Sequence, residues 1–280
     1  MNVKMYALNL GYFGTDLEMI LTGHPDLTLR PEHRERKKVR YQCPSFGFII
    51  EHPEGRILFE TGTSPYWRDE WPDEYKRPTD WGQLTPEDFL QHKLKVMGLG
   101  PEDFRYVVAG HLHCDHAGGL RLFEKAGTEV LIHEDEYKGA LSLEEDENFM
   151  ARADFEFLPR KKPTLVYGEQ EIMTGVRLIS LPGHTWGTMG MMVHLDHTGW
   201  VFLPTDALHH HKTYGPPAVG SFLLTMFMDR WAQSVEKVRR LATKYEALIV
   251  PGHDETGIHQ HADGTTGLVE LKFYPDHVYE

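Results

Sequence analysis

One short segment, rich in metal-binding side chains, constrains this chain more than any other. Residues 111–116 read His-Leu-His-Cys-Asp-His and directly follow the β-branched run Tyr106–Gly110. Three imidazoles and a carboxylate within these six positions are the ligands that zinc and similar divalent ions prefer. The segment therefore predicts a binuclear metal site where a strand ends.

The spacing divides the four side chains between two ions. Side chains alternate along a strand, so His111 and His113 can point the same way and hold one ion. Asp115 and His116 lie past the strand end, where they can face a second ion. The glycine pair at 118–119 lets the backbone come close to its neighbours before the next helix begins.

Three later apolar runs each lead to one more residue of this kind. Ligand sites in α/β proteins tend to lie at the carboxyl ends of strands. The chain thus offers seven candidate ligands, delivered by separate strands. The later runs and their residues are Val176–Leu181 with His184, Trp200–Thr205 with Asp206, and Ala247–Val250 with His253.

This ordered set resembles the metal pattern of the metallo-β-lactamase superfamily, from about Phe46 to His253. The resemblance implies an α/β fold, a four-layer αββα sandwich. It also implies two divalent ions, with zinc favoured over iron, manganese or cobalt. Carried over residue by residue, it assigns His111, His113 and His184 to one ion, Asp115, His116 and His253 to the other, and Asp206 to both as a bridge.

Within the superfamily, the motif and the step from Gly183–His184 to Asp206 are most similar to those of the N-acyl-homoserine lactone lactonases. This implies a quorum-quenching hydrolase that opens a lactone ring by attack of a metal-bridging hydroxide. Asp115 is then expected to pass a proton to the leaving alkoxide.

Other reactions use the same kind of site. The alternative that stays open is another hydrolase of the superfamily, acting on a thioester, aryl ester, β-lactam or phosphotriester. A di-iron redox protein is disfavoured, because His113 stands where such proteins place an acid. A non-catalytic binding protein is disfavoured because all seven ligand positions are filled.

Two positions depart from the family pattern. Glu60, in Glu-Thr-Gly at 60–62, stands where the superfamily has aspartate, and we expect it to orient a ligand histidine. The lactonases carry a tyrosine three residues after the bridging aspartate, where this chain has His209. We therefore expect His209 or Tyr214 to help stabilise the substrate carbonyl.

Charge and composition indicate which partners and which cellular location to expect. The formal net charge of −13 argues against nucleic-acid partners, because phosphate binding needs a basic surface. No stretch reaches the ~18 apolar residues that span a bilayer, and Met1–Leu10 reads as a first strand rather than a secretory signal. The two cysteines, Cys43 and Cys114, suggest no disulfide framework, and we expect Cys114 to pack rather than ligate. These features predict a cytoplasmic enzyme without a membrane partner.

We expect a single domain over residues 1–280, because the candidate ligands come from both halves of the chain. Two segments look inserted, at about 11–42 and 63–81. The second is aromatic enough to be a lid, a substrate wall or a homodimer interface, although a locally packed loop is an equal alternative. The basic run at 33–40 reads as a solvated face or an interface element.

Two loops are expected to border the site. Residues 12–21 and 207–228 carry apolar side chains that can line a pocket for the acyl part of a small-molecule substrate. The remaining elements predicted from periodicity and capping are strands at Phe46–Glu51, Arg56–Phe59 and Glu129–His133, and helices at Thr85–Met97, about Leu120–Ala126, Glu134–Leu143 and Asp229–Lys244.

Overall fold

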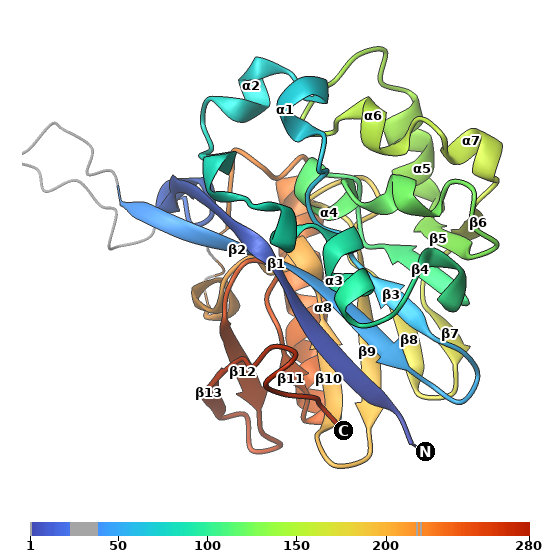
Figure 1. Cartoon of the computed structure of the whole chain (residues 1–280). Coiled ribbons are helices and arrows are strands. Elements are labelled where there is room, and N and C mark those ends of the chain that lie inside the picture. Colours follow the sequence, from blue (N-terminus) through green and yellow to red (C-terminus); the bar gives the residue numbers. More distant parts are fainter. Residues whose placement is uncertain (1, 23–38, 217, 219) are drawn as a thin grey trace, which may run out of the picture.

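Two β-sheets packed face to face form the centre of the molecule (Figure 1). The computed structural model describes residues 2–22, 39–216, 218 and 220–280. The first sheet has six strands that pair in chain order, antiparallel up to the third and parallel from there on. They are β1 (Lys4–Asp16), β2 (Arg40–Glu51), β3 (Ile57–Phe59), β4 (Tyr106–Ala109), β5 (Glu129–His133) and β6 (Thr164–Val166).

The second sheet takes its seven strands from the rest of the chain, again in sequence order. All its pairs are antiparallel except the tenth strand with the eleventh, which are joined by a long helix. The strands are β7 (Gln170–Met173), β8 (Val176–Ser180), β9 (Met189–Leu195), β10 (Gly199–Leu203), β11 (Leu248–Ile249), β12 (Thr256–Gln260) and β13 (Thr266–Glu270).

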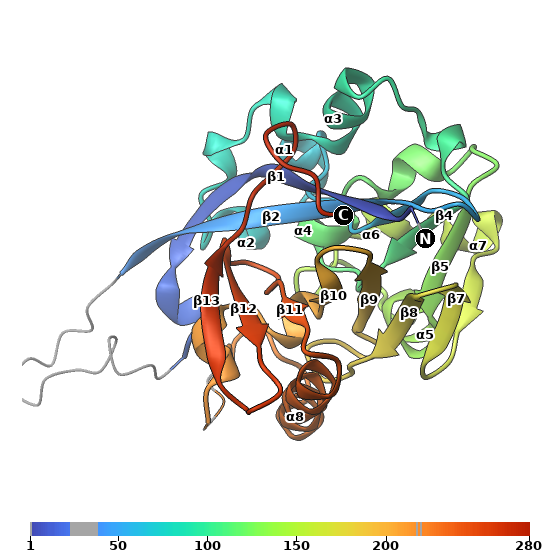
Figure 2. The same cartoon turned by 90° about the horizontal axis from the view of Figure 1, so that it is seen from below.

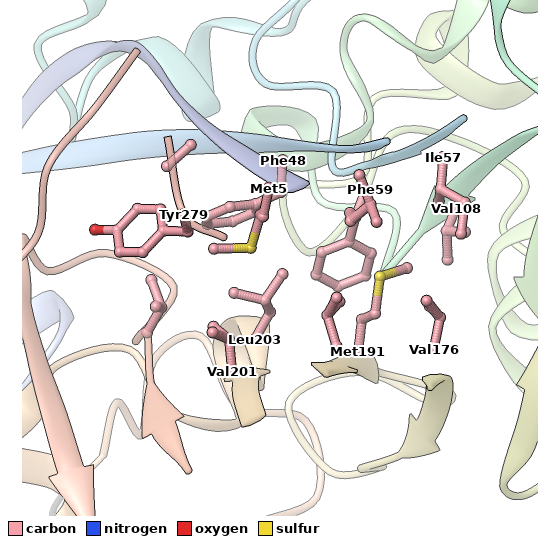
Figure 3. Packing of buried hydrophobic residues seen from close by; sticks show 14 of the residues in the cluster. Met5, Phe48, Ile57, Phe59, Val108, Val176, Met191, Val201, Leu203 and Tyr279 are labelled. Carbon is pink, nitrogen blue, oxygen red and sulfur yellow. The ribbon is translucent and has the colours of Figure 1, made fainter. Parts of the chain in front are cut away.

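The inner faces of the two sheets share one hydrophobic core (Figure 3). Alternation along β9 shows how it is built: Met189, Met191 and Val193 point into this core, whereas Met192 packs on the opposite face. On β4, Val108 points inward and Val107 outward in the same way. Because both faces of these strands are buried, their sequences are apolar throughout rather than alternating.

Helices cover both outer faces, which confirms the αββα architecture (Figure 2). The outer face of the second sheet packs against α8 (Met228–Tyr245) through Trp231, Val235, Val238 and Leu241, which lie at helical spacing. Among the described residues, no helix is both long enough and apolar enough to cross a membrane. The first sheet is covered by α3 (Leu90–Val96), α4 (Cys114–Ala117), α5 (Glu134–Leu141), α6 (Arg152–Phe155) and α7 (Leu158–Lys161).

Two predicted helices take a different form. The expected helix at Thr85–Met97 is a 3₁₀ turn, Pro86–Asp88, followed by α3, because Phe89 between them has an extended backbone. The Thr85 side chain and backbone N–H bind Asp88 as a capping box, so the predicted start is confirmed. The helix expected over about Leu120–Ala126 is only a 3₁₀ turn, Leu120–Phe123.

The two segments that looked inserted contribute ordered structure near one end of the sheets. The first is partly a continuation of β1 and β2, which pair as far as Asp16 and Arg40. Most of the basic run at 33–40 lies outside the described residues. The second holds α1 (Trp67–Glu70) and α2 (Asp73–Lys76), and four of its aromatic side chains are buried in a cluster with residues of β1. Those four are Trp67, Trp71, Tyr75 and Trp81.

Candidate metal centre

The histidine-rich motif begins where β4 ends and closes with the short helix α4. β4 stops at Ala109, so the motif is a loop and one helical turn rather than a strand extension. His111 and His113 nevertheless lie together, with ring centroids 4.8 Å apart. The following turn requires glycine, because a Cβ at Gly118 would lie 2.0 Å from the backbone nitrogen of Ser64.

The first group of candidate ligands joins this motif to the second sheet. His111, His113, His184 and Asp206 each place one ligand atom within 4.8 Å of the others. His113 Nδ1 is 2.9 Å from His184 Nε2, and His184 Nε2 is 3.2 Å from Asp206 Oδ2. All four side chains are buried. The loop after β8 thus delivers His184 to the end of β4, as the strand-end argument predicted.

The second group lies beside the first. Asp115, His116 and His253 likewise place their ligand atoms within 4.8 Å of one another. His116 Nε2 is 3.1 Å from His253 Nε2, which is 3.4 Å from Asp115 Oδ2. Asp206 faces this group as well, at 3.4 Å from His116 and 3.2 Å from His253. Asp206 therefore stands between the two groups, where a bridging ligand would be.

The polar atoms of the two groups fit divalent cations. In each group two ring nitrogens face each other at about hydrogen-bond distance, His113 with His184 and His116 with His253. Among the described residues, both nitrogens of His111 and Oδ1 of Asp206 are buried without a hydrogen-bond partner. Buried polar atoms are rarely left in this condition, and lone pairs that converge in this way suit a metal ion. The donor set of imidazoles and carboxylates suits zinc and other borderline divalent ions.

The charges in the site point the same way. Burial holds the pKa of His111 and of His113 well below the usual value, and lowers that of His184 to about 4, so these rings are neutral, as metal binding requires. Burial works against a charge on His116 too, but the carboxylates of Asp206, Asp115 and Glu60 outweigh it and raise its pKa to about 10. Positive charge is therefore favoured beside these carboxylates, and a metal ion supplies it.

Glu60 supports the second group from behind. Its Oε2 lies 2.9 Å from His116 Nδ1, so the expected contact with a ligand histidine is present. The residue has a φ of 65°, a conformation that costs energy for a non-glycine residue and recurs at functional sites. Gly110 makes room for the longer side chain, because a Cβ there would lie 1.9 Å from Glu60 Oε1.

Glu136 is a supporting residue that the sequence did not reveal. It is fully buried on α5 and accepts hydrogen bonds from the Leu112 backbone (2.9 Å), the Thr185 hydroxyl (2.7 Å) and the Gly187 backbone (2.9 Å). Leu112 lies between two candidate ligands, and Thr185 follows a third. One carboxylate thus joins the two loops that carry the three histidines of the first group. In the sequence it is one of three acids at a helix start, which helix-dipole effects already explain.

The two residues expected to contact the substrate carbonyl lie in different places. His209 Nε2 is 3.3 Å from Asp206 Oδ2, so this side chain lies beside the candidate bridging residue. The Tyr214 hydroxyl instead donates to Gln260 Oε1 at 2.7 Å. Its ring packs in the core beneath α8. The structure therefore brings His209 to the candidate ligands but not Tyr214.

A pocket opens onto the two groups. Four candidate ligands line it, and most of its other lining residues are apolar. The wall combines the loop after β1, the aromatic segment 63–81 and the stretch after Asp206, as predicted for the two bordering loops. The ligands at the cavity are His113, Asp115, Asp206 and His253, and the other lining residues are Phe13, Thr15, Met19, Ile20, Thr79, Trp81, Cys114, Phe149 and Leu224. Cys114 is a buried free thiol, in keeping with packing.

The sequence matches known proteins along most of its length. A model of the Metallo-beta-lactamase superfamily matches residues 40–253. An N-acyl homoserine lactonase, AiiB, of Agrobacterium fabrum is 26% identical over 284 residues, covering 96% of this chain and 100% of that protein. An N-acyl homoserine lactonase of Bacillus thuringiensis is 29% identical over 218 residues, covering 75% of this chain and 81% of its own length.

Solved structures have the same fold. An N-acyl homoserine lactone hydrolase with N-hexanoyl-L-homoserine bound at its catalytic metal centre superposes with a TM-score of 0.74 at 25% identity, covering 91% of this chain and 94% of that chain. AidC, described as a dizinc quorum-quenching lactonase, superposes with a TM-score of 0.69 at 17% identity, covering 97% of this chain and 95% of its own.

Proposed function

Because the chain belongs to the metallo-β-lactamase superfamily, we propose that it is a binuclear metal-dependent hydrolase that opens the lactone ring of N-acyl homoserine lactones. The observation that carries this proposal is the juxtaposition of two histidine-carboxylate groups, joined by Asp206, with an apolar cavity. Relatives named as N-acyl homoserine lactonases, which align over nearly the whole chain, support the same substrate class.

We propose that His111, His113 and His184 hold one ion, that Asp115, His116 and His253 hold the other, and that Asp206 bridges them. Zinc is our first choice, because the nitrogen and oxygen donors match its preference. When bound, two such ions supply the Lewis acidity that makes water nucleophilic near neutral pH and polarises a carbonyl.

The chain's own residues set the geometry of the reaction. Asp206 is fixed between the two groups, and Glu60 holds the ring of His116 from its far side. Asp115 is the candidate ligand best placed for proton transfer, because it lines the cavity and its side chain is 13% exposed, against 4% or less for His116 and Asp206. As water adds to the carbonyl and the ring C–O bond breaks, Asp115 passes the proton of the water to the leaving oxygen. The product is the open-chain hydroxy acid.

The cavity wall accounts for the acyl part of the substrate. Phe13, Met19, Ile20, Trp81 and Leu224 line the same pocket as four of the candidate ligands. A ligand pocket of this kind is apolar with a few convergent polar groups. A lactone ring lying against Asp115 and His253 would therefore direct an acyl chain along the apolar wall.

Hydrolysis of N-hexanoyl and N-decanoyl homoserine lactone tests the proposal directly. We expect turnover that is lost after chelation and regained when zinc is returned, because bound metal ions would make the attacking water nucleophilic. The variant His113→Ala should lose more than a thousandfold in kcat/KM. His197→Ala, which alters an exposed histidine in the turn between β9 and β10, serves as the matched control and should retain the parent rate.

A panel of other substrates separates this proposal from its alternative. A thioester, an aryl ester, a β-lactam and a phosphotriester can be compared with the lactones at equal concentration. Preference for any of these over both lactones, together with loss of that activity in His113→Ala, would assign the chain to another hydrolase of the superfamily. Full lactonase activity in metal-stripped protein would contradict the metal-dependent mechanism itself.

A further inference from the structure

His209 is a buried histidine whose ring nitrogens lack hydrogen-bond partners. Its side chain has no exposed surface, and neither nitrogen makes a hydrogen bond to any described residue. Desolvating an imidazole without giving its nitrogens a partner costs free energy, and such groups are rare in folded proteins. A partner other than the described side chains is therefore expected at this ring.

The position of the ring identifies that partner. His209 Nε2 is 3.3 Å from Asp206 Oδ2, and His184 and His253 each approach the same oxygen to 3.2 Å. The His209 and His184 rings stand edge to face, 4.8 Å apart at 75°. The His111 and His184 rings are related in nearly the same way, at 4.8 Å and 84°. His209 thus has the same relation to Asp206 as two of the proposed ligands.

The backbone holds His209 in this place. The His209 carbonyl accepts a hydrogen bond from the His253 backbone at 2.9 Å, and Leu208 accepts one from Gly252 at 2.9 Å. Backbone hydrogen bonds therefore join the loop after Asp206 to the loop that carries His253. These two bonds fix the backbone position from which the His209 ring reaches Asp206.

The neighbouring histidines do not share this role. His211 Nδ1 lies 2.5 Å from Asp254 Oδ2, and His210 Nδ1 is 3.1 Å from the same oxygen. These two rings therefore face Asp254, whereas His209 faces Asp206. His209 is also absent from the described residues that line the cavity, so a contact with the substrate carbonyl does not explain its burial.

We infer that His209 is an additional metal-ligating residue, which binds through Nε2 beside Asp206, and is not a substrate-contacting one. This inference rests on the binuclear site of the proposed function. It adds an eighth ligand to the seven proposed above, at a position outside the motif that carries the family resemblance.

Metal binding by variants tests the inference without reference to turnover. Metal-free parent, His209→Gln and His209→Asn proteins would be titrated with Co²⁺ and followed by visible absorption, which reports the number and type of ligands. Competition with a chelator gives the two affinities. Glutamine preserves a hydrogen-bond donor near the Nε2 position but is a poor ligand for a divalent ion. His52→Gln, a substitution of a buried histidine on the turn between β2 and β3, is the matched control.

For both His209 variants we expect a changed Co²⁺ spectrum and at least a tenfold weaker affinity for one of the two ions, whereas His52→Gln should match the parent. A parent-like spectrum and parent-like affinities in His209→Gln would overturn the inference and leave His209 as a hydrogen-bond donor to Asp206. If the spectrum changes but the parent protein hydrolyses no lactone, the ligand assignment stands and the proposed function fails. Circular dichroism of each variant confirms that the fold is intact.

Discussion

Replacing Asp154 with asparagine should remove one source of the pH dependence of stability. Asp154 lies on α6 with no exposed surface, and its Oδ2 accepts a hydrogen bond from Trp71 Nε1 at 3.0 Å. Its Oδ1 has no hydrogen-bond partner among the described residues. Burial raises the pKa of this carboxyl to about 8, so the folded protein keeps it protonated at neutral pH.

The size of the effect follows from proton linkage. The unfolded chain releases this proton near the usual aspartate pKa of about 3.9, whereas the folded protein releases it near 8. Between these values the folded state binds one more proton, so its stability falls by about 1.4 kcal/mol for each unit of rising pH. The contribution of the protonated Asp154 carboxyl to stability is fully present below about pH 4 and is lost by about pH 8. From pH 5 to pH 7 the loss is therefore about 2.7 kcal/mol.

An asparagine side chain at this position cannot titrate, and its amide oxygen can still accept from Trp71. As the pH rises from 5 to 7, the free energy of unfolding of Asp154→Asn should increase by about 2.7 kcal/mol relative to that of the parent. Urea unfolding at each pH gives the free energy of unfolding of the parent and of the variant, provided that the two proteins show the same dependence on urea concentration. Asp276→Asn, a change of an exposed aspartate, should show no such drift. A constant difference between Asp154→Asn and the parent across this range would refute the reasoning.

Three further predictions concern the site itself. Glu136→Gln should weaken metal binding roughly 10- to 100-fold, because an amide cannot accept all three hydrogen bonds that now join the two loops. Competition with a chelator measures the affinity, and an unchanged affinity would show that Glu136 does not support the site. Leu224→Trp should reduce kcat/KM for N-decanoyl homoserine lactone more than tenfold but change it less than threefold for N-butanoyl homoserine lactone. The reason is that the indole ring would fill the apolar pocket in which we place the long acyl chain. Equal losses for the two substrates would show that the acyl chain lies elsewhere. Returning zinc to stripped protein at a thousandfold excess over Kd should raise the unfolding free energy by about 4 kcal/mol for each of the two ions. Calorimetry showing no shift would mean that the metal does not bind the folded state preferentially.

The candidate ligands that follow strands could be located from local sequence. His184, Asp206 and His253 each follow an apolar run that forms a strand of the second sheet. The hydrophobic period locates a strand end to within a few residues, and strand ends on one edge of a sheet converge in space. The chemistry of a convergent site could therefore be read before the fold was known.

The local form of the backbone was harder to predict. The stretch after the Gly-Gly pair has the composition of a helix, but it forms only one 3₁₀ turn. Close packing explains part of this, because Gly119 lies against the Thr61 backbone, and a Cβ there would be 2.5 Å from the Thr61 oxygen. Such tertiary contacts override helix propensity, and a sequence does not display them.

Residues that act across long sequence distances were not predictable. Glu136 lies 24 and 51 positions from the Leu112 and Gly187 amides that it accepts from. The placement of His209 beside Asp206 also depends on how its loop joins that of His253. Nothing in the local pattern distinguishes Glu136 from a solvated acid at a helix start, because its hydrogen bonds form only after the loops have packed.

The division of the ligands between the two sheets has a consequence for how the protein matures. The motif after β4 belongs to the first sheet, and His184, Asp206 and His253 extend from the second. On the proposed assignment neither half of the chain holds a complete set of ligands, so tight uptake of two ions would have to wait until both sheets have docked. Bound metal would then join segments that are more than a hundred residues apart in the sequence, such as those of His116 and His253. Bringing such distant segments together in the unfolded chain is entropically costly. Metal uptake would therefore act as a checkpoint of completed folding, and protein cleaved or arrested between the two halves would stay metal-free.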